Sequence, residues 1–332
     1  MLRFIARRVL LMIPTLFVIS ALVYFIIDLP PGDCVTSQID ELLARGDADA
    51  HRRAEELREL YGLNMPLWQR YLDWVGGIFR WDFGLSCQDT VPVADLIGER
   101  LTLTIIMETS TIAFIWIVSF LIGTYAATHQ YRLGDYVASF IGFIGLAIPN
   151  FLLALVLLYV GKVYFGLSIG GLMDPEYIDK PLSWGKALSV MQHLIIPVIV
   201  IGMSGTAGMI RRLRANLLDE LQKQYVVTGR AKGLPPMKLL VKYPLRHSLN
   251  PFVADIGGLL PDVISGSVIV SVVLSLPTTG PMLLGALKTQ DVNLAATFLL
   301  FVATLTVIGM LISDLALAAL DPRIRFGATS EK

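Results

Sequence analysis

Residues 225–251 read YVVTGRAKGLPPMKLLVKYPLRHSLNP, a polar and basic stretch in a chain whose other long segments are apolar. The letters GLPP at 233–236 predict an elbow between two helices, because glycine relaxes the backbone and proline fits the first turn of a new helix. In the second helix the residues of one face recur at helical spacing opposite Lys238, Lys242 and Arg246. That face is Met237, Leu240, Val241, Pro244, Leu245 and Ser248, with Pro244 expected to bend or end the helix. The pattern favours equally a helix on anionic lipid headgroups and a helix docked in a partner's groove.

The composition is that of an integral membrane protein. Hydrophobic residues make up 55% of the 332 positions and charged residues 16%, with a mean hydropathy of +0.65 that soluble chains of this length rarely reach. Six runs are long enough to cross about 30 Å of hydrocarbon. They lie at 9–27, 104–127, 137–160, 194–210, 252–276 and 294–313. We therefore expect an all-α membrane protein with six transmembrane helices and both termini on one side.

The distribution of basic residues predicts the orientation. The first span follows Arg3, Arg7 and Arg8 and has no small-residue cleavage pattern after it, so we interpret it as an uncleaved anchor. With the N-terminus inside, 16 of the 27 Lys and Arg residues lie in inside segments, although the net charge is zero. Seven of the others lie in the long 28–101 loop, which carries little topological weight. Both termini are therefore expected in the cytoplasm.

The loop at 28–101 is expected outside the membrane. Residues 37–61 predict a charged amphipathic helix with a sparse apolar face. The aromatic residues that follow are typical of an interfacial belt rather than a ligand platform; they are Trp68, Tyr71, Trp74, Phe79 and Trp81. Cys34 and Cys87 are the two cysteines of the chain. A bridge between them, worth about 4 kcal/mol in the chain-entropy model, and two free thiols are equally favoured.

Few polar groups are predicted at membrane depth. Glu108 lies near the outer end of the second span, where a hydrated or inter-subunit hydrogen-bonded role is favoured over proton relay. Pro149 must free a backbone carbonyl, and Asn150 can compensate locally or line a cavity. The fifth span is rich in small residues, which permit close helix approach or line a path. The predicted translocation path therefore comprises Pro149, Asn150, Asp262, Ser265 and Ser267.

Several catalytic motifs are absent from the sequence. No G-x-x-x-x-G-K-[ST] occurs, so the chain is not expected to bind ATP through a P-loop. The GMSG at 202–205 resembles the motif of an intramembrane serine protease, but that chemistry needs a base beside the serine. None of the four histidines lies well inside a later span or has metal-ligand spacing. We interpret Ser204 as a helix-packing residue and expect neither a catalytic site nor a cofactor or metal site.

Residues 225–234 (YVVTGRAKGL) and 244–251 (PLRHSLNP) resemble the cytoplasmic "EAA" coupling loop of bacterial ABC importer permeases. The peptide and nickel permease family has Y-x-x-T-A-R-A-K-G-L followed by H-A-L-R-N-A-x-x-P. Further matches occur in order along the chain: Arg7-Arg8, Pro31-Gly32-Asp33, Tyr61-Gly62-Leu63 with Pro66 and Tyr71, DFGLS at 82–86, Arg100-Leu101, Ile148-Pro149-x-Phe151 and DPRIR at 321–325. Gly229 stands where alanine is commoner. Ser271 replaces the usual acidic residue, and Thr278 departs from the pattern at the start of a predicted outer hairpin.

The resemblance implies the fold of a type I ABC importer permease. Its parts would be the cytoplasmic N-terminus and first span at 1–27, an extracytoplasmic loop at 28–101, a permease core at 102–324 and a cytoplasmic tail at 325–332. The core would carry the coupling loop at 211–251 between spans four and five. The coupling residues that it implies are Thr228, Gly229, Arg230, Ala231, Lys232, Gly233, Leu234, Met237, Leu240 and Val241.

The resemblance also implies partners. They are a second homologous permease, two ATPase subunits that bind ATP and Mg, an extracytoplasmic solute-binding protein and the lipid of the bacterial inner membrane, with no nucleic acid. A di- or oligopeptide is the leading substrate class, ahead of an oligosaccharide, an opine-like conjugate or a nickel complex. The alternative of another class is a secondary transporter or channel that works alone, which often has an internal repeat and coupling charges. No convincing repeat is evident in the sequence.

Overall fold

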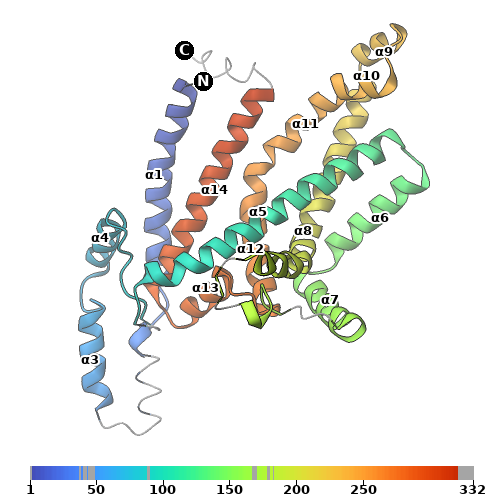
Figure 1. The fold of residues 1–332 in the computed structure, drawn as a ribbon. Coiled ribbons are helices and arrows are strands. Elements are labelled where there is room, and N and C mark those ends of the chain that lie inside the picture. Colours follow the sequence, from blue (N-terminus) through green and yellow to red (C-terminus); the bar gives the residue numbers. More distant parts are fainter. Residues whose placement is uncertain are drawn as a thin grey trace. The chain divides into compact units, whose positions relative to one another are not determined.

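A computed structural model describes residues 2–36, 39, 43, 49–87, 90–166, 170–177, 180, 181 and 183–320. Across these residues the chain is helical, and its one β-bridge joins Leu85 to Pro92. Figure 1 shows the helices in chain order. They are α1 (Leu2–Ile27), α3 (Ala50–Leu60), α4 (Leu67–Ile78), α5 (Val93–Thr128), α6 (Leu133–Ala147), α7 (Asn150–Phe165), the 3-10 helix η1 (Pro175–Tyr177), α8 (Trp184–Leu221), α9 (Gln224–Ala231), α10 (Pro236–Lys242), α11 (Pro244–Ala254), α12 (Ile256–Val273), α13 (Thr279–Lys288) and α14 (Val292–Leu320). The DPRIR motif and the predicted tail lie outside the described residues.

Within the described ranges, four helices are long and apolar enough to cross a membrane. They are α1, α5, α8 and α14, and they cover the first, second, fourth and sixth predicted spans. The pair α6 and α7 counts as a fifth crossing if the two helices form one broken span. The fifth predicted span corresponds to α12, a shorter apolar helix that follows α11. The structure therefore supports an all-α membrane protein, and the count of six spans stays a prediction.

The third predicted span is not one helix with a kink. The chain bends by 105° between α6 and α7. Ile148 has an extended backbone, with φ −90° and ψ 123°, and Pro149 caps α7. A residue before proline avoids the helical region, because the proline ring clashes with its backbone and Cβ. The break at Pro149 is therefore predictable from the sequence. The 105° angle of the bend is not.

The chain divides into two compact units. One comprises Leu10–Ile105 and Pro277–Leu305, and it contains the whole predicted outer loop. Its core buries Tyr24 with Tyr71 and Trp74, and the ring centroids of Tyr24 and Trp74 lie 5.2 Å apart. The predicted aromatic belt is therefore wrong for Tyr71 and Trp74, which are core residues. The other members of that group are exposed: Trp68, Phe79 and Trp81.

The predicted amphipathic helix at 37–61 is observed in part. Its second half is α3, and most of its first half lies outside the described residues. Ala54 of α3 packs in a small apolar cluster with Val35 and Ile39. This cluster also contains both cysteines, so the start of the loop is held close to residues near its end.

The other unit comprises Met1–Val9, Ile106–Leu276 and Thr306–Lys332, and α8 is its central helix. Helices α6, α7, α11 and α12 all contact α8. Asp135 of α6 is 3% exposed and accepts two hydrogen bonds from Arg214 of α8, at 2.8 and 2.7 Å. Such a bidentate pair fixes orientation as well as distance. It therefore anchors α6 beside the end of α8 that leads to α9.

Candidate functional site: a helical elbow and a polar cavity

Helices α9 and α10 fold onto each other beside the end of α8 (Figure 1). Val226 and Gly229 of α9 are buried, and so is Leu239 of α10. A Cβ atom at position 229 would lie 2.5 Å from Cδ1 of Leu239. Glycine therefore lets the leucine pack against the backbone of α9. This contact gives a physical reason for Gly229 at a position where the resembling family has alanine.

The elbow lies where the sequence predicts it. Gly233 has a φ of +75°, the left-handed region that side chains disfavour. Its N–H donates to the carbonyl of Arg230 at 3.0 Å, and the N–H of Leu234 donates to Gly229 at 3.2 Å, so two terminal carbonyls of α9 are satisfied. No atom lies within 4 Å of a Cβ built at Gly233. Backbone conformation rather than space therefore requires glycine here.

One side of the elbow is open to a partner. Its apolar members are Val227 of α9 with Met237 and Val241 of α10. The predicted coupling residues Leu234 and Leu240 are half-buried. The remaining predicted coupling residues are exposed: Thr228, Arg230, Ala231, Lys232 and Gly233. The exposed surface is therefore apolar in part and basic in part, and we call it the elbow surface.

The second helix of the elbow ends just before Pro244, as the sequence predicts. Helix α10 ends at Lys242, and Tyr243 leaves the helical region with φ −121° and ψ −78° before α11 begins. Leu245 then packs with Ala127 and Leu217 inside the same unit. A proline at 244 has no N–H and clashes with the preceding turn, which favours the end of α10 before it. Only the first half of the predicted apolar stripe is therefore available to a partner.

A second feature of the same unit is a cavity of about 310 Å³. Its wall carries Asp262 of α12 and Arg212 of α8, and the rest of the lining is Leu146, Ile201, Ser204, Gly205, Gly208, Leu259 and Val263. Asp262 is exposed, and within the described part of the chain no hydrogen bond or ion pair reaches its carboxylate. Sequence reasoning missed Ser204 as a cavity residue, because a serine in a helix gives no signal of the surface that it faces.

The predicted path residues fall into separate groups. Asp262 and Ser265 are exposed on one face of α12. A Cβ at Gly266 of α12 would lie 3.4 Å from Nδ2 of Asn150, so the start of α7 is next to this helix. Pro149 is exposed beside it. Ser267 is different, because it is buried and donates to the carbonyl of Ile264 at 2.8 Å. The structure therefore places Ser267 in packing rather than on the exposed face.

Glu108 is buried more deeply than the sequence suggests. Its side chain is 4% exposed and lies beside the hydroxyl of Ser267 on α12. The hydrated role expected for Glu108 is therefore wrong within this unit. The sequence indicates how far along the span a residue lies, but it does not indicate which neighbouring helix covers it.

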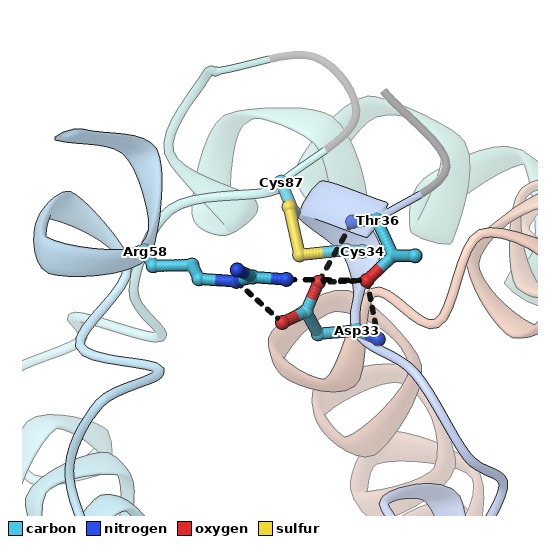
Figure 2. A network of polar contacts seen from close by, with 5 residues as sticks. All are labelled: Asp33, Cys34, Thr36, Arg58 and Cys87. Atoms are coloured by element: carbon cyan, nitrogen blue, oxygen red, sulfur yellow. Dashed lines mark hydrogen bonds and ion pairs between the residues drawn. A yellow bond between two sulfur atoms is a disulfide. The ribbon is translucent and has the colours of Figure 1, made fainter. Parts of the chain in front are cut away.

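A polar network fixes the start of the predicted outer loop, as Figure 2 shows. Cys34 and Cys87 are joined by a disulfide, 53 residues apart in sequence. Beside it, Asp33 accepts hydrogen bonds from the N–H of Thr36 at 2.7 Å and from Nε of Arg58 at 2.9 Å. Burial by itself raises the pKa of the Asp33 carboxyl, but the hydrogen bonds from Thr36 and Arg58 outweigh it and hold the pKa below its usual range.

Residues 119–326 match the family described as "Binding-protein-dependent transport system inner membrane component". Residues 1–108 match its companion, "Binding-prot-dependent transport system membrane comp, N-term". This chain belongs to that permease family. It is therefore a permease subunit of an ABC importer, a multi-pass protein of the bacterial inner membrane, rather than an enzyme. Membership implies a binding protein and ATPase subunits as partners.

Relatives of the permease align with it along nearly their whole length. The oligopeptide transport system permease protein AppB of Bacillus subtilis is 33% identical over 327 residues, 97% of this chain and 99% of the relative. The dipeptide transport system permease protein DppB of Escherichia coli K12 is 30% identical over 341 residues, 98% and 99% of the two chains. The oligopeptide transport system permease protein OppB of Haemophilus influenzae is 28% identical over 331 residues, 98% and 100%.

Proposed function

We propose that this permease forms half of a translocation pathway for peptides. The other half would be a second, homologous permease, and two ATPase subunits would bind ATP and Mg on the cytoplasmic side. Both termini of this chain would then lie in the cytoplasm. The single observation that carries the substrate class is the full-length similarity to permeases named for oligopeptide and dipeptide transport.

The elbow surface is the proposed contact with an ATPase subunit. It joins exposed apolar side chains, Met237 and Val241, to the exposed basic side chains Arg230 and Lys232. Buried apolar anchors supply most of the affinity of an interface, and charges at the rim supply orientation. The alternative is adsorption to lipid headgroups. The close contact of Leu239 with Gly229 supports a partner, because it joins α9 and α10 so that both would move together when an ATPase subunit moves.

The exposed face of α12 is the proposed wall of the path. Asp262 and Ser265 lie there at membrane depth, and a carboxylate in contact with lipid is costly. A water-filled passage removes that cost. Asn150 lies next to the same helix and is a further polar group on this side. Ser267 is not included, because its hydroxyl is satisfied within α12.

The test is uptake of labelled trialanine into proteoliposomes that contain the permease pair, the ATPase subunits and the binding protein. We expect accumulation that requires both ATP and the binding protein. A labelled oligosaccharide of similar size is the matched comparison. Uptake of the oligosaccharide without uptake of any peptide would refute the substrate class and leave the importer assignment intact.

A further inference from the structure

The wall of the cavity between α8 and α12 carries two opposite charges, Arg212 and Asp262. Asp255 and Asp262 are seven residues apart on the fifth predicted span, which is about 10 Å along a helix axis at 1.5 Å per residue. Nη1 of Arg212 lies 2.7 Å from Oδ2 of Asp255, so the guanidinium lies near the Asp255 end. Arg212 and Asp262 both line the cavity. Asp255 and Asp262 are therefore separated by about two helical turns, with the Arg212 guanidinium next to Asp255.

Each charged group has capacity left for a ligand. Asp262 is exposed and has no partner among the described residues. Arg212 has five N–H donors, of which its contact with Asp255 engages one nitrogen. Its other terminal nitrogen, Nη2, lies 3.6 Å from a Cβ built at Gly208, a residue of the cavity wall. The guanidinium therefore lies along the wall, with Nη1 toward Asp255 and Nη2 beside the cavity glycine.

Gly205 of the wall packs against Ile115, since an added Cβ would lie 2.9 Å from Cδ1 of that residue, whereas Gly208 has no such neighbour among the described residues. At Gly208 the one atom of the described residues within 4 Å of an added Cβ, apart from its own helix backbone, is Nη2 of Arg212 at 3.6 Å, an ordinary contact distance. Gly258, one turn before Asp262 on the exposed face of α12, has nothing within 4 Å. An alanine would fit at either position. Gly258 is outside the cavity lining, and the small size of Gly208 leaves space beside the Arg212 guanidinium.

We infer that this cavity binds the two charged ends of a short peptide in transit, Asp262 the N-terminal ammonium and Arg212 the C-terminal carboxylate. The inference rests on the proposed function and identifies the ligand groups of its path. An extended chain spans at most about 3.3–3.6 Å per residue, so a separation of about 10 Å fits a peptide of about three residues. A site that contacts only the two ends of a peptide does not select among its side chains. A passage of this kind discriminates by charge and length.

The test is equilibrium binding of trialanine to the assembled permease–ATPase complex in nanodiscs, without the binding protein, by isothermal titration calorimetry. Asp262→Asn removes the ammonium partner and should weaken trialanine binding at least tenfold, because a charge-assisted hydrogen bond is lost. N-acetyl-trialanine has no ammonium, so it should bind the variant and the wild type equally. Arg212→Lys keeps the charge but loses the planar fork, and it should weaken trialanine and spare trialanine amide. Asp219→Asn is the control, an exposed aspartate of α8 outside the cavity lining.

The outcomes separate a binding role from a structural one. Equal loss of affinity for free and N-acetylated peptide in Asp262→Asn would mean that the residue only supports the fold, and it would overturn the inference. Unchanged affinity, or no saturable binding to the wild-type complex, would overturn it too. Wild-type uptake of trialanine in proteoliposomes is measured in parallel. If the wild type takes up trialanine but the variants do not distinguish free from end-blocked peptides, the inference fails and the proposed function survives.

Discussion

Two exposed apolar side chains of α10 predict the strength of the contact with an ATPase subunit. Met237 is 71% exposed and Val241 is 55% exposed in the isolated chain. Full burial of such a side chain is worth about 1.5–3 kcal/mol. Scaled by these exposed fractions and reduced by what alanine retains, the double substitution Met237→Ala with Val241→Ala should cost about 2 kcal/mol of docking free energy. At 1.4 kcal/mol per factor of ten, the affinity should fall about thirtyfold.

The assay is titration of purified ATPase subunit onto the permease pair in nanodiscs, followed by fluorescence anisotropy. Phe79→Ala is the matched control, because Phe79 is 87% exposed but lies in the outer loop of the other unit. It should leave the affinity unchanged. An unchanged affinity in the Met237 and Val241 double variant, with the protein still in the membrane, would refute the reasoning. The elbow surface would then lie on lipid rather than on a partner.

Three further predictions follow from the elbow and the outer loop. Gly233→Ala should strain the left-handed elbow by about 1–2 kcal/mol and lower transport while ATP hydrolysis continues. Gly233→Asn should lower transport less, because asparagine tolerates this conformation better. Equal transport in the two variants would contradict the prediction. Cys34→Ser should destabilise the outer loop by about 4 kcal/mol in the chain-entropy model, seen as faster proteolysis at 28–101; an unchanged rate would argue against a bridge to Cys87. The hydrogen bonds from Thr36 and Arg58 lower the pKa of Asp33 in the folded protein. The stability that these bonds contribute is therefore complete above the unfolded pKa of about 3.9 and is lost as the pH falls through the folded pKa. Thermal melts of Asp33→Asn should lack this loss of stability at acid pH.

Local sequence signals predicted the elbow correctly, because they act through the backbone. Gly233 supplies the left-handed conformation, and Pro236 occupies the first turn of α10. These preferences need no distant partner. The break at Tyr243 follows in the same way from Pro244, although its consequence for Leu245 depends on the cluster around Leu217.

The sites formed by distant residues could not be predicted from the sequence. The pair of Asp135 and Arg214 joins positions 79 residues apart, and nothing in the pattern of either helix indicates the other. Ser267 shows the same limit. Ser265 and Ser267 are the same residue type two positions apart in one helix, but Ser265 is exposed and Ser267 is buried. Which face is exposed depends on how α12 packs against α7 and α8.

The buried aromatic residues of the unit at Leu10–Ile105 and Pro277–Leu305 show why composition misleads. Trp74 donates to Oγ1 of Thr297 at 3.1 Å, and Oγ of Ser20 lies 2.9 Å from the hydroxyl of Tyr71. A tryptophan or tyrosine suits an interfacial belt and a core equally, because each has an apolar body and a polar tip. The sequence alone does not indicate whether water or another side chain satisfies that tip.

The central claim is that this permease works only as part of an ATP-driven importer supplied by a binding protein. Its most direct test is labelled trialanine uptake into proteoliposomes, first with this chain alone under an imposed ion gradient and then with the complete importer. The account predicts no uptake by the chain alone and accumulation by the complete importer only when ATP and the binding protein are both present. Accumulation by the chain alone, driven by the ion gradient, would contradict the account and indicate a secondary transporter.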